Sequence, residues 1–255
     1  MTSKLEKLWA TKTKDDEWWS SFVTAPLAIA ANYIAVERAW ITPNRITLAS
    51  FLVAVLAAIC IVIGGQANYI IAAVLIHLSH VLDCMDGQMA RYRQVSSAIG
   101  SYFDRLTDQV QVILWFGAIG YAAYAQTLRV EPLILAFIGV AFYGLRGYVK
   151  YVAIEIEMTR DSSYQTKMAQ LKETPAVAGL GFGFRANALW LFREQSKILG
   201  FDEGVFIFML SAALVLNALT PMLWIFAVSQ LFYGVFRAVQ QGSQIGENAK
   251  SPVKK

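Results

Sequence analysis

Four aspartates stand out in this chain because they occur as two close pairs inside otherwise apolar sequence. Asp83 and Asp86 form one pair, and Asp104 and Asp108 form the other. Residues three or four positions apart share a face of an α-helix, so each pair projects from one side of its helix. At about 1.5 Å per residue, Asp86 lies roughly 8 Å before the end of its helix and Asp104 roughly 10 Å into the next. The spacing therefore predicts that four carboxylates converge at similar depth.

The cost of burying these carboxylates predicts what neutralises them. One ionised side chain within a membrane span costs about 3 kcal/mol, and four together cost on the order of 10 kcal/mol. That sum is comparable to the stability of a whole domain. Arg91 and Arg105 cannot supply four charges. Several hard oxygen ligands suit Mg²⁺, Mn²⁺ or Ca²⁺, so we predict a metal site rather than carboxylates that merely reach solvent at a helix end.

Two small residues complete the acidic face. Gly87 and Ala90 lie four and seven positions after Asp83. Small side chains there let a bulky ligand approach the helix backbone, and close packing of two helices through small residues is the alternative explanation.

The elements that position these residues are predicted to be membrane helices. The chain has 255 residues, of which 56% are hydrophobic and 16% charged, with a mean hydropathy of +0.46. Soluble domains carry about 25% charged residues, so the composition favours an integral membrane protein. We expect no signal peptide in the polar N-terminal segment and no disulfide between Cys60 and Cys84, which both fall within apolar runs.

The apolar runs predict an all-α protein with six transmembrane helices. The segment before them, from Trp18 to Trp40, is predicted as an interfacial helix, with a seventh span as the alternative. One domain, 1–255, divides into an N-terminal cytoplasmic or interfacial segment (1–44), spans one to four with the site (45–156), a cytoplasmic amphipathic excursion (157–203), spans five and six (204–239) and a polar tail (240–255). The predicted spans are Arg45 to Gly64, Tyr69 to Arg91, Ala98 to Ala125, Pro132 to Ile156, Gly204 to Leu219, and Pro221 to Val239.

The distribution of basic residues predicts the orientation. Lysines and arginines gather before span one, after spans two and four, and after span six, whereas only Arg129 falls on the other side. By the positive-inside rule, both termini and the acidic end of spans two and three face the cytoplasm. We therefore expect a multi-pass protein of the plasma membrane.

The acidic segment resembles the signature of the CDP-alcohol phosphotransferases. It reads Asp-x2-Asp-Gly-x2-Ala-Arg-x8-Gly-x3-Asp-x3-Asp, with eight fixed positions within 26 residues: Asp83, Asp86, Gly87, Ala90, Arg91, Gly100, Asp104 and Asp108. The six-span layout and the Thr42-Pro43-Asn44 entry into span one are also similar to that family. The resemblance implies a homodimeric transferase with Mg²⁺ or Mn²⁺, two ions per site, and no nucleic-acid partner.

The resemblance also implies roles for the signature residues. Asp83, Asp86 and Asp104 would ligate metal, and Asp108 would complete the metal site and orient or deprotonate the acceptor hydroxyl. Arg91 would contact the donor's phosphates. Gly87 and Ala90 would lie beneath the cytidine.

Four residues outside the signature are further candidates. Asn44 and Thr47 either reach the nucleotide or cap the first span. Arg146 and Lys150 either bind an anionic acceptor or anchor span four at the cytoplasmic surface. His80 and His77 lie one and two turns before Asp83, where hydrogen bonding to a neighbouring helix is more common than catalysis.

The predicted function is metal-dependent transfer of a substituted phosphate from CDP-diacylglycerol to a small polar alcohol, with release of CMP, in phospholipid synthesis. The alternative within the class uses a polar CDP-alcohol, such as CDP-inositol, CDP-glycerol or CDP-choline, and a lipid or polyol-phosphate acceptor. A cation transporter is a remote alternative, because spans one, five and six carry no ionisable group at mid-depth.

Overall fold

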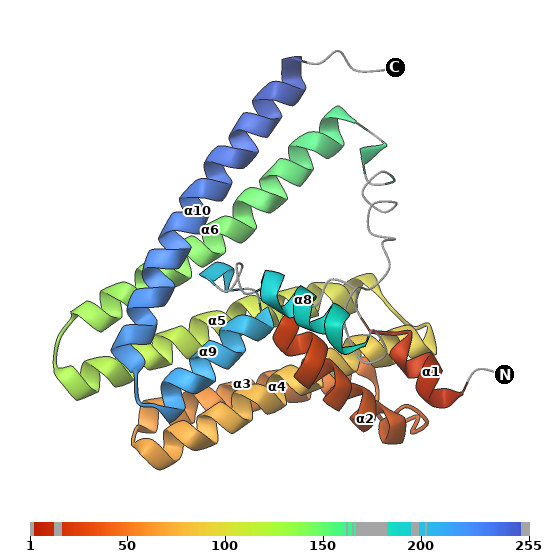
Figure 1. Cartoon of the computed structure of the whole chain (residues 1–255), viewed down its shortest axis with the longest axis horizontal. Helices are drawn as coiled ribbons and strands as arrows, with labels where there is room; N and C mark the ends of the chain where they lie inside the picture. Colours follow the sequence, from red (N-terminus) through yellow and green to blue (C-terminus); the bar gives the residue numbers. More distant parts are fainter. Residues whose placement is uncertain are drawn as a thin grey trace.

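The computed structural model describes an all-helical arrangement for residues 3–12, 17–161, 163–164, 166, 183–194, 199–201 and 203–250. Within these ranges there is no β-strand. Figure 1 shows the helices in chain order, which are α1 (Lys4–Trp9), the π-helix η1 (Ser20–Thr24), α2 (Ala25–Ala35), α3 (Pro43–Ile63), α4 (Gln66–Arg93), α5 (Ala98–Thr127), α6 (Glu131–Arg160), α8 (Phe184–Glu194), α9 (Glu203–Val215) and α10 (Leu219–Lys250).

Four of the described helices are long and apolar enough to cross a bilayer: α3, α4, α6 and the Leu219–Glu247 part of α10. The predicted third span, α5, has 30 residues but carries Gln109, Gln111 and Gln126 among its apolar side chains. The predicted fifth span, α9, has 13 residues, which corresponds to about 20 Å against a hydrocarbon core of about 30 Å. The described helices thus support a multi-pass membrane protein. Of the six predicted spans, α5 does not meet the hydropathy criterion and α9 does not meet the length criterion.

Two predicted boundaries differ most from the structure. The last helix continues past Val239 to Lys250, because polar side chains such as Gln240 and Gln241 do not themselves end a helix. The predicted interfacial segment from Trp18 to Trp40 is helical only as far as Ala35. Within the predicted amphipathic excursion (157–203), α8 covers Phe184–Glu194, and residues 195–198 lie outside the described part of the chain.

Local signals in the sequence fix the ends of the helices around the acidic pairs. Gly64 and Gly65 have φ angles of +79° and +85°, a backbone region that glycine adopts without strain, and they form the short turn between α3 and α4. Gln94 ends α4 in the left-handed region. The Ser97 Oγ atom accepts a hydrogen bond of 3.1 Å from the Gly100 amide, so Ser97 is the N-cap of α5.

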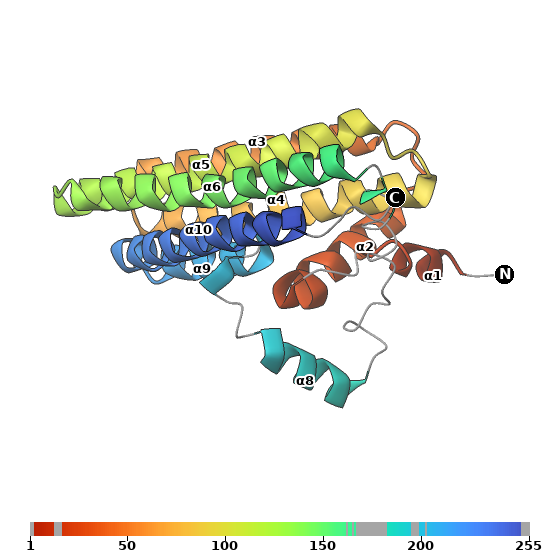
Figure 2. The same ribbon diagram turned by 90° about the horizontal axis from the view of Figure 1, so that it is seen from above.

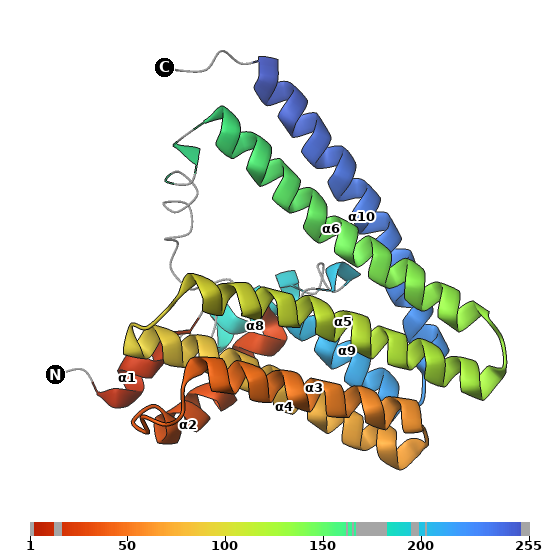
Figure 3. The ribbon, with the colours of Figure 1, turned by 180° about the vertical axis from the view of Figure 1, so that it is seen from behind.

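The hydrophobic core joins the two parts of the bundle. In Figures 1 and 3, α6 and α10 run side by side and diverge from α5 toward the end at which α5 begins. At the other end, the Phe226 ring of α10 stacks on the Phe116 ring of α5, with 3.6 Å between the ring centres. Gly139 of α6 makes room for that ring, because a Cβ atom there would overlap a carbon of the Phe226 ring. Close packing therefore fixes one end of the α6–α10 pair.

The acidic helices are held by their neighbours. The helix α3 packs against both α4 and α5, and in the view from above in Figure 2 the N-terminal helices α1 and α2 lie along one end of α4. This arrangement sets the side chains of α4 and α5 opposite one another.

Candidate active site

Three of the four predicted carboxylates meet at one point between α4 and α5. Asp83, Asp104 and Asp108 are half-buried, and one oxygen from each lies within 4.8 Å of the others. An ion central to three such oxygens would lie at most about 2.8 Å from each of them, and Mg²⁺ binds oxygen at about 2.1 Å. Each oxygen therefore needs to move by only about 0.7 Å to bind such an ion, and hard carboxylate oxygens are its preferred ligands. The residues fit a divalent cation.

The fourth carboxylate lies outside that group of three. Asp86 is 5% exposed and accepts a hydrogen bond from the Thr47 hydroxyl of α3. Thr47 was also a candidate cap, but the cap of α3 is Thr42, whose hydroxyl accepts from the Arg45 amide at 3.4 Å. Thr47 therefore orients the Asp86 carboxylate and is not the N-cap of α3.

A small cavity of about 130 Å³ begins at Asp86. Its lining includes every predicted donor-binding residue and residues from the first two turns of α5. The lining residues are Pro43, Asn44, Thr47, Asp86, Gly87, Ala90, Arg91, Val95, Ser96, Ser97, Gly100, Ser101 and Asp104. Asp104 belongs both to this lining and to the carboxylate group. The cavity and the candidate metal site are therefore contiguous.

Glycines keep this cavity open. A Cβ atom on Gly87 would lie 3.2 Å from an Arg91 guanidinium nitrogen. A Cβ atom on Gly100 would lie 3.1 Å from the Ser97 hydroxyl and 3.6 Å from the Asn44 side-chain oxygen. Both glycines thus permit polar side chains of the lining to lie close to the helix backbone.

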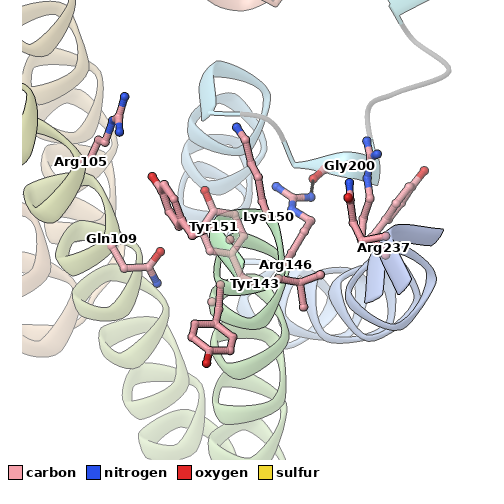
Figure 4. A pocket seen from close by; sticks show the side chains of 14 residues that line it. Arg105, Gln109, Tyr143, Arg146, Lys150, Tyr151, Gly200 and Arg237 are labelled. Carbon is pink, nitrogen blue, oxygen red and sulfur yellow. Dashed lines mark hydrogen bonds between the residues drawn. The ribbon is translucent and has the colours of Figure 1, made fainter. Parts of the chain in front are cut away.

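A second, larger cavity of about 860 Å³ lies where α6 and α10 diverge from α5. Both predicted acceptor-binding residues, Arg146 and Lys150, line it. Figure 4 shows that Arg105 and Gln109 of α5 and Arg237 of α10 also line this space. Its lining residues include these four cations and no aspartate or glutamate, so the cavity favours an anion.

Arg146 is held in the wall of the larger cavity. It donates a hydrogen bond to the Gly200 carbonyl oxygen, and its guanidinium carbon lies 5.1 Å from the Tyr143 ring centre. Gly200 is followed by Phe201, which is fully buried and contacts Phe226 at 5.3 Å between ring centres. The segment Gly200–Phe201, just before α9, therefore holds Arg146 in position in the cavity wall.

The sequence from residue 40 to residue 232 matches the profile of the CDP-alcohol phosphatidyltransferases. The chain belongs to this family. The matched region contains the whole acidic segment and the lining of both cavities except Tyr233, Arg237 and Gln241.

Three curated relatives show how far the likeness to single proteins extends. A bifunctional IPC transferase and DIPP synthase of Thermococcus kodakarensis is 25% identical over 51% of this chain and 29% of its own length. The inner membrane protein YnjF of Escherichia coli is 34% identical over 41% and 49%. Cholinephosphotransferase 1 of Xenopus laevis is 28% identical over 36% and 25%. The chain thus spans less than half the length of each of these relatives.

The two histidines make structural hydrogen bonds in this family member. His77 Nδ1 lies 3.0 Å from the Ala73 carbonyl oxygen and 3.1 Å from the Ser211 hydroxyl of α9. His80 Nε2 lies 2.9 Å from the Ser20 hydroxyl of η1. Both side chains therefore connect α4 to neighbouring elements, as their position within an apolar helix predicts.

Sequence reasoning missed three residues of the larger cavity. Arg105, Gln109 and Arg237 were not predicted to form a pocket with Arg146. Arg105 and Gln109 are four positions apart on one helix, which is the signal that would have found a shared face. The contribution of Arg237 depends on the packing of α10 against α6, which no local pattern encodes.

Proposed function

We propose that this chain transfers a substituted phosphate group from a CDP-linked alcohol to the hydroxyl of a second alcohol and releases CMP. One observation carries the proposal. Six of the eight signature residues line the small cavity, and the other two, Asp83 and Asp108, join Asp104 in the carboxylate group. A donor in the cavity would therefore have its diphosphate beside the candidate metal site.

The residues have separate roles in this reaction. Gly87 and Ala90 form a floor on which the cytidine lies, and Arg91 contacts the phosphates. A divalent ion held by the carboxylates would neutralise charge that develops on the diphosphate oxygens during in-line displacement. Asp108 accepts the proton of the attacking hydroxyl. Its position one turn after Asp104, outside the lining of the small cavity, supports this role. By the family resemblance Asp86 is the fourth metal ligand, although its carboxylate lies outside the group of three and accepts a hydrogen bond from Thr47.

We place the acceptor in the larger cavity. Two of its lining residues, Arg105 and Gln109, directly follow Asp104 and Asp108 in the chain, so the cavity and the carboxylate group use the same stretch of α5. Its four cations favour an alcohol that carries negative charge, such as the phosphate monoester of a polyol. Arg146 and Lys150 are the predicted acceptor contacts, and Arg105 and Arg237 add to them.

The donor, the acceptor and the topology are proposed as the sequence predicts them. We propose CDP-diacylglycerol as donor and a small polar alcohol as acceptor, in phospholipid synthesis, with a polar CDP-alcohol and a lipid or polyol-phosphate acceptor as the alternative. In this proposal α5 and α9 complete six spans, and both termini and the site face the cytoplasm, since basic residues gather there. Two Mg²⁺ or Mn²⁺ ions per site and a homodimer come from the family resemblance.

The proposal is tested by CMP release. Membranes containing the protein are incubated with Mn²⁺, CDP-diacylglycerol labelled in the cytidine, and a panel that pairs each neutral polyol with its phosphate ester. We expect CMP with at least one acceptor, abolition by a chelator, and loss of turnover in Asp108→Asn membranes. The same panel with CDP-choline tests the alternative donor. Absence of CMP from all mixtures, with protein of normal abundance, would overturn the proposal.

A further inference from the structure

The N-terminal segment before residue 40 lies outside the region that matches the family, yet it is fastened to the acidic helix α4. The buried Asn32 of α2 donates a hydrogen bond of 2.9 Å to the Met85 carbonyl oxygen. In return, the buried Gln88 of α4 donates one of 3.2 Å to the Ala25 carbonyl oxygen. Buried amides in this reciprocal arrangement specify one position of α2 along α4.

The short helix α1 docks on the same structure. Leu8 is fully buried, whereas Leu5 on the same helix is 47% exposed. At its first turn, Ser3 and Glu6 form a capping box, which satisfies amide groups at the helix start. Lys4 makes an ion pair of 2.7 Å with Glu37, just after α2. These contacts hold a helix of only six residues, a length that is not stable alone.

The segment just after α1 contacts the signature residue Arg91. The carbonyl oxygen of Thr11, two residues after α1, accepts a hydrogen bond of 2.7 Å from the Nε atom of Arg91. Thr11 is itself buried and donates its hydroxyl to the Leu8 carbonyl oxygen at 2.6 Å. The Arg91 guanidinium lies over Gly87, in the lining of the small cavity. The Arg91 side chain is solvent-exposed and flexible, and the hydrogen bond to Thr11 fixes the position of its Nε atom.

We propose that α1 is a positioning element of the donor site: through the Thr11 carbonyl group it directs Arg91 at the donor's phosphates. This inference rests on the proposed function, because it takes Arg91 as a phosphate contact. It assigns the donor affinity of this chain in part to a segment outside the common region of the family. One hydrogen bond of this kind changes affinity about 3- to 10-fold.

The test uses CMP with Mn²⁺ as the probe, titrated calorimetrically into the purified full chain. Leu8→Ala removes the buried anchor of α1 and should weaken CMP binding about 3- to 10-fold. Leu5→Ala, an equal truncation on the exposed side of α1, should leave the affinity unchanged. Ser3→Ala loosens α1 from its exposed end without a core cavity, and should weaken binding in the same direction.

A double-mutant cycle separates positioning from a general loss of structure. In an Arg91→Gln background, Leu8→Ala should have no further effect on CMP affinity, because the contact that α1 positions is already gone. If Leu8→Ala weakens binding equally in both backgrounds, or leaves it unchanged in the wild-type chain, the inference is overturned. If the wild-type chain binds no CMP with Mn²⁺, the proposed function fails first and the inference fails with it.

Discussion

Replacement of Arg146 by glutamine should selectively impair the use of a phosphorylated acceptor. Arg146 is half-buried in the wall of the larger cavity and is held by Gly200 and Tyr143. A hydrogen bond between a charged pair contributes about 1.5–3 kcal/mol, so its loss corresponds to about a 10- to 150-fold lower kcat/KM. Glutamine keeps a donor for the Gly200 carbonyl group but not the charge.

The exposed Arg237 gives a matched comparison in the same cavity. Its charge is screened by solvent, so Arg237→Gln should cost about 1 kcal/mol, or about 5-fold in kcat/KM, and the effect should shrink at high salt. Arg129→Gln, in the connection between α5 and α6 at the opposite end of the bundle, should change nothing.

The assay compares a polyol phosphate with the neutral polyol at saturating donor, and then varies the donor at saturating acceptor. We expect Arg146→Gln to lower kcat/KM for the phosphorylated acceptor only, with the KM for the donor unchanged. An equal loss for neutral and phosphorylated acceptors, or a loss that appears in the donor KM, would refute the assignment of this cavity to an anionic acceptor.

Three further predictions concern the donor cavity, the topology and the core. Ala90→Leu should fill part of the small cavity of about 130 Å³ and weaken CMP binding while the protein extracts normally; unchanged binding would make the residue a packing position only. In a chain without its native cysteines, a reagent outside intact cells should label a thiol at Gln66 but not at Gln94, and the reverse result would invert the topology. Gly139→Ala should lower the thermal midpoint in detergent, because overpacking costs about 1–3 kcal/mol, whereas Gly117→Ala, with no atom within 4 Å, should not.

The sequence predicted the local features of the site well because they depend on helical periodicity. The spacing of the four aspartates predicted convergence, and three of them lie together. Ser97 caps α5 as a serine before a helix commonly does. The predicted donor residues all line one cavity, because on both α3 and α4 they recur at three- or four-residue spacing and so face the same neighbours.

Features that depend on tertiary packing were not predictable in the same way. Thr11 contacts Arg91 through its backbone, so its side-chain type gives no signal. The larger cavity requires α6 and α10 to diverge from α5 while Phe226 packs against Gly139, and neither residue is unusual in the sequence. The orientation of Asp86 toward Thr47 instead of the other carboxylates arises from the packing of α3 against α4.

The most direct test of the central claim is the metal-dependent affinity of the chain for CMP. Calorimetric titration with and without Mn²⁺ should show binding to the wild-type chain only with the metal, and Asp83→Asn should abolish it. Asp108→Asn should keep much of the affinity while it loses roughly 100-fold or more in turnover, since a general base acts on the acceptor and not on the nucleotide. CMP binding that is indifferent to Mn²⁺ and survives Asp83→Asn would contradict a metal-assisted nucleotide site at these carboxylates.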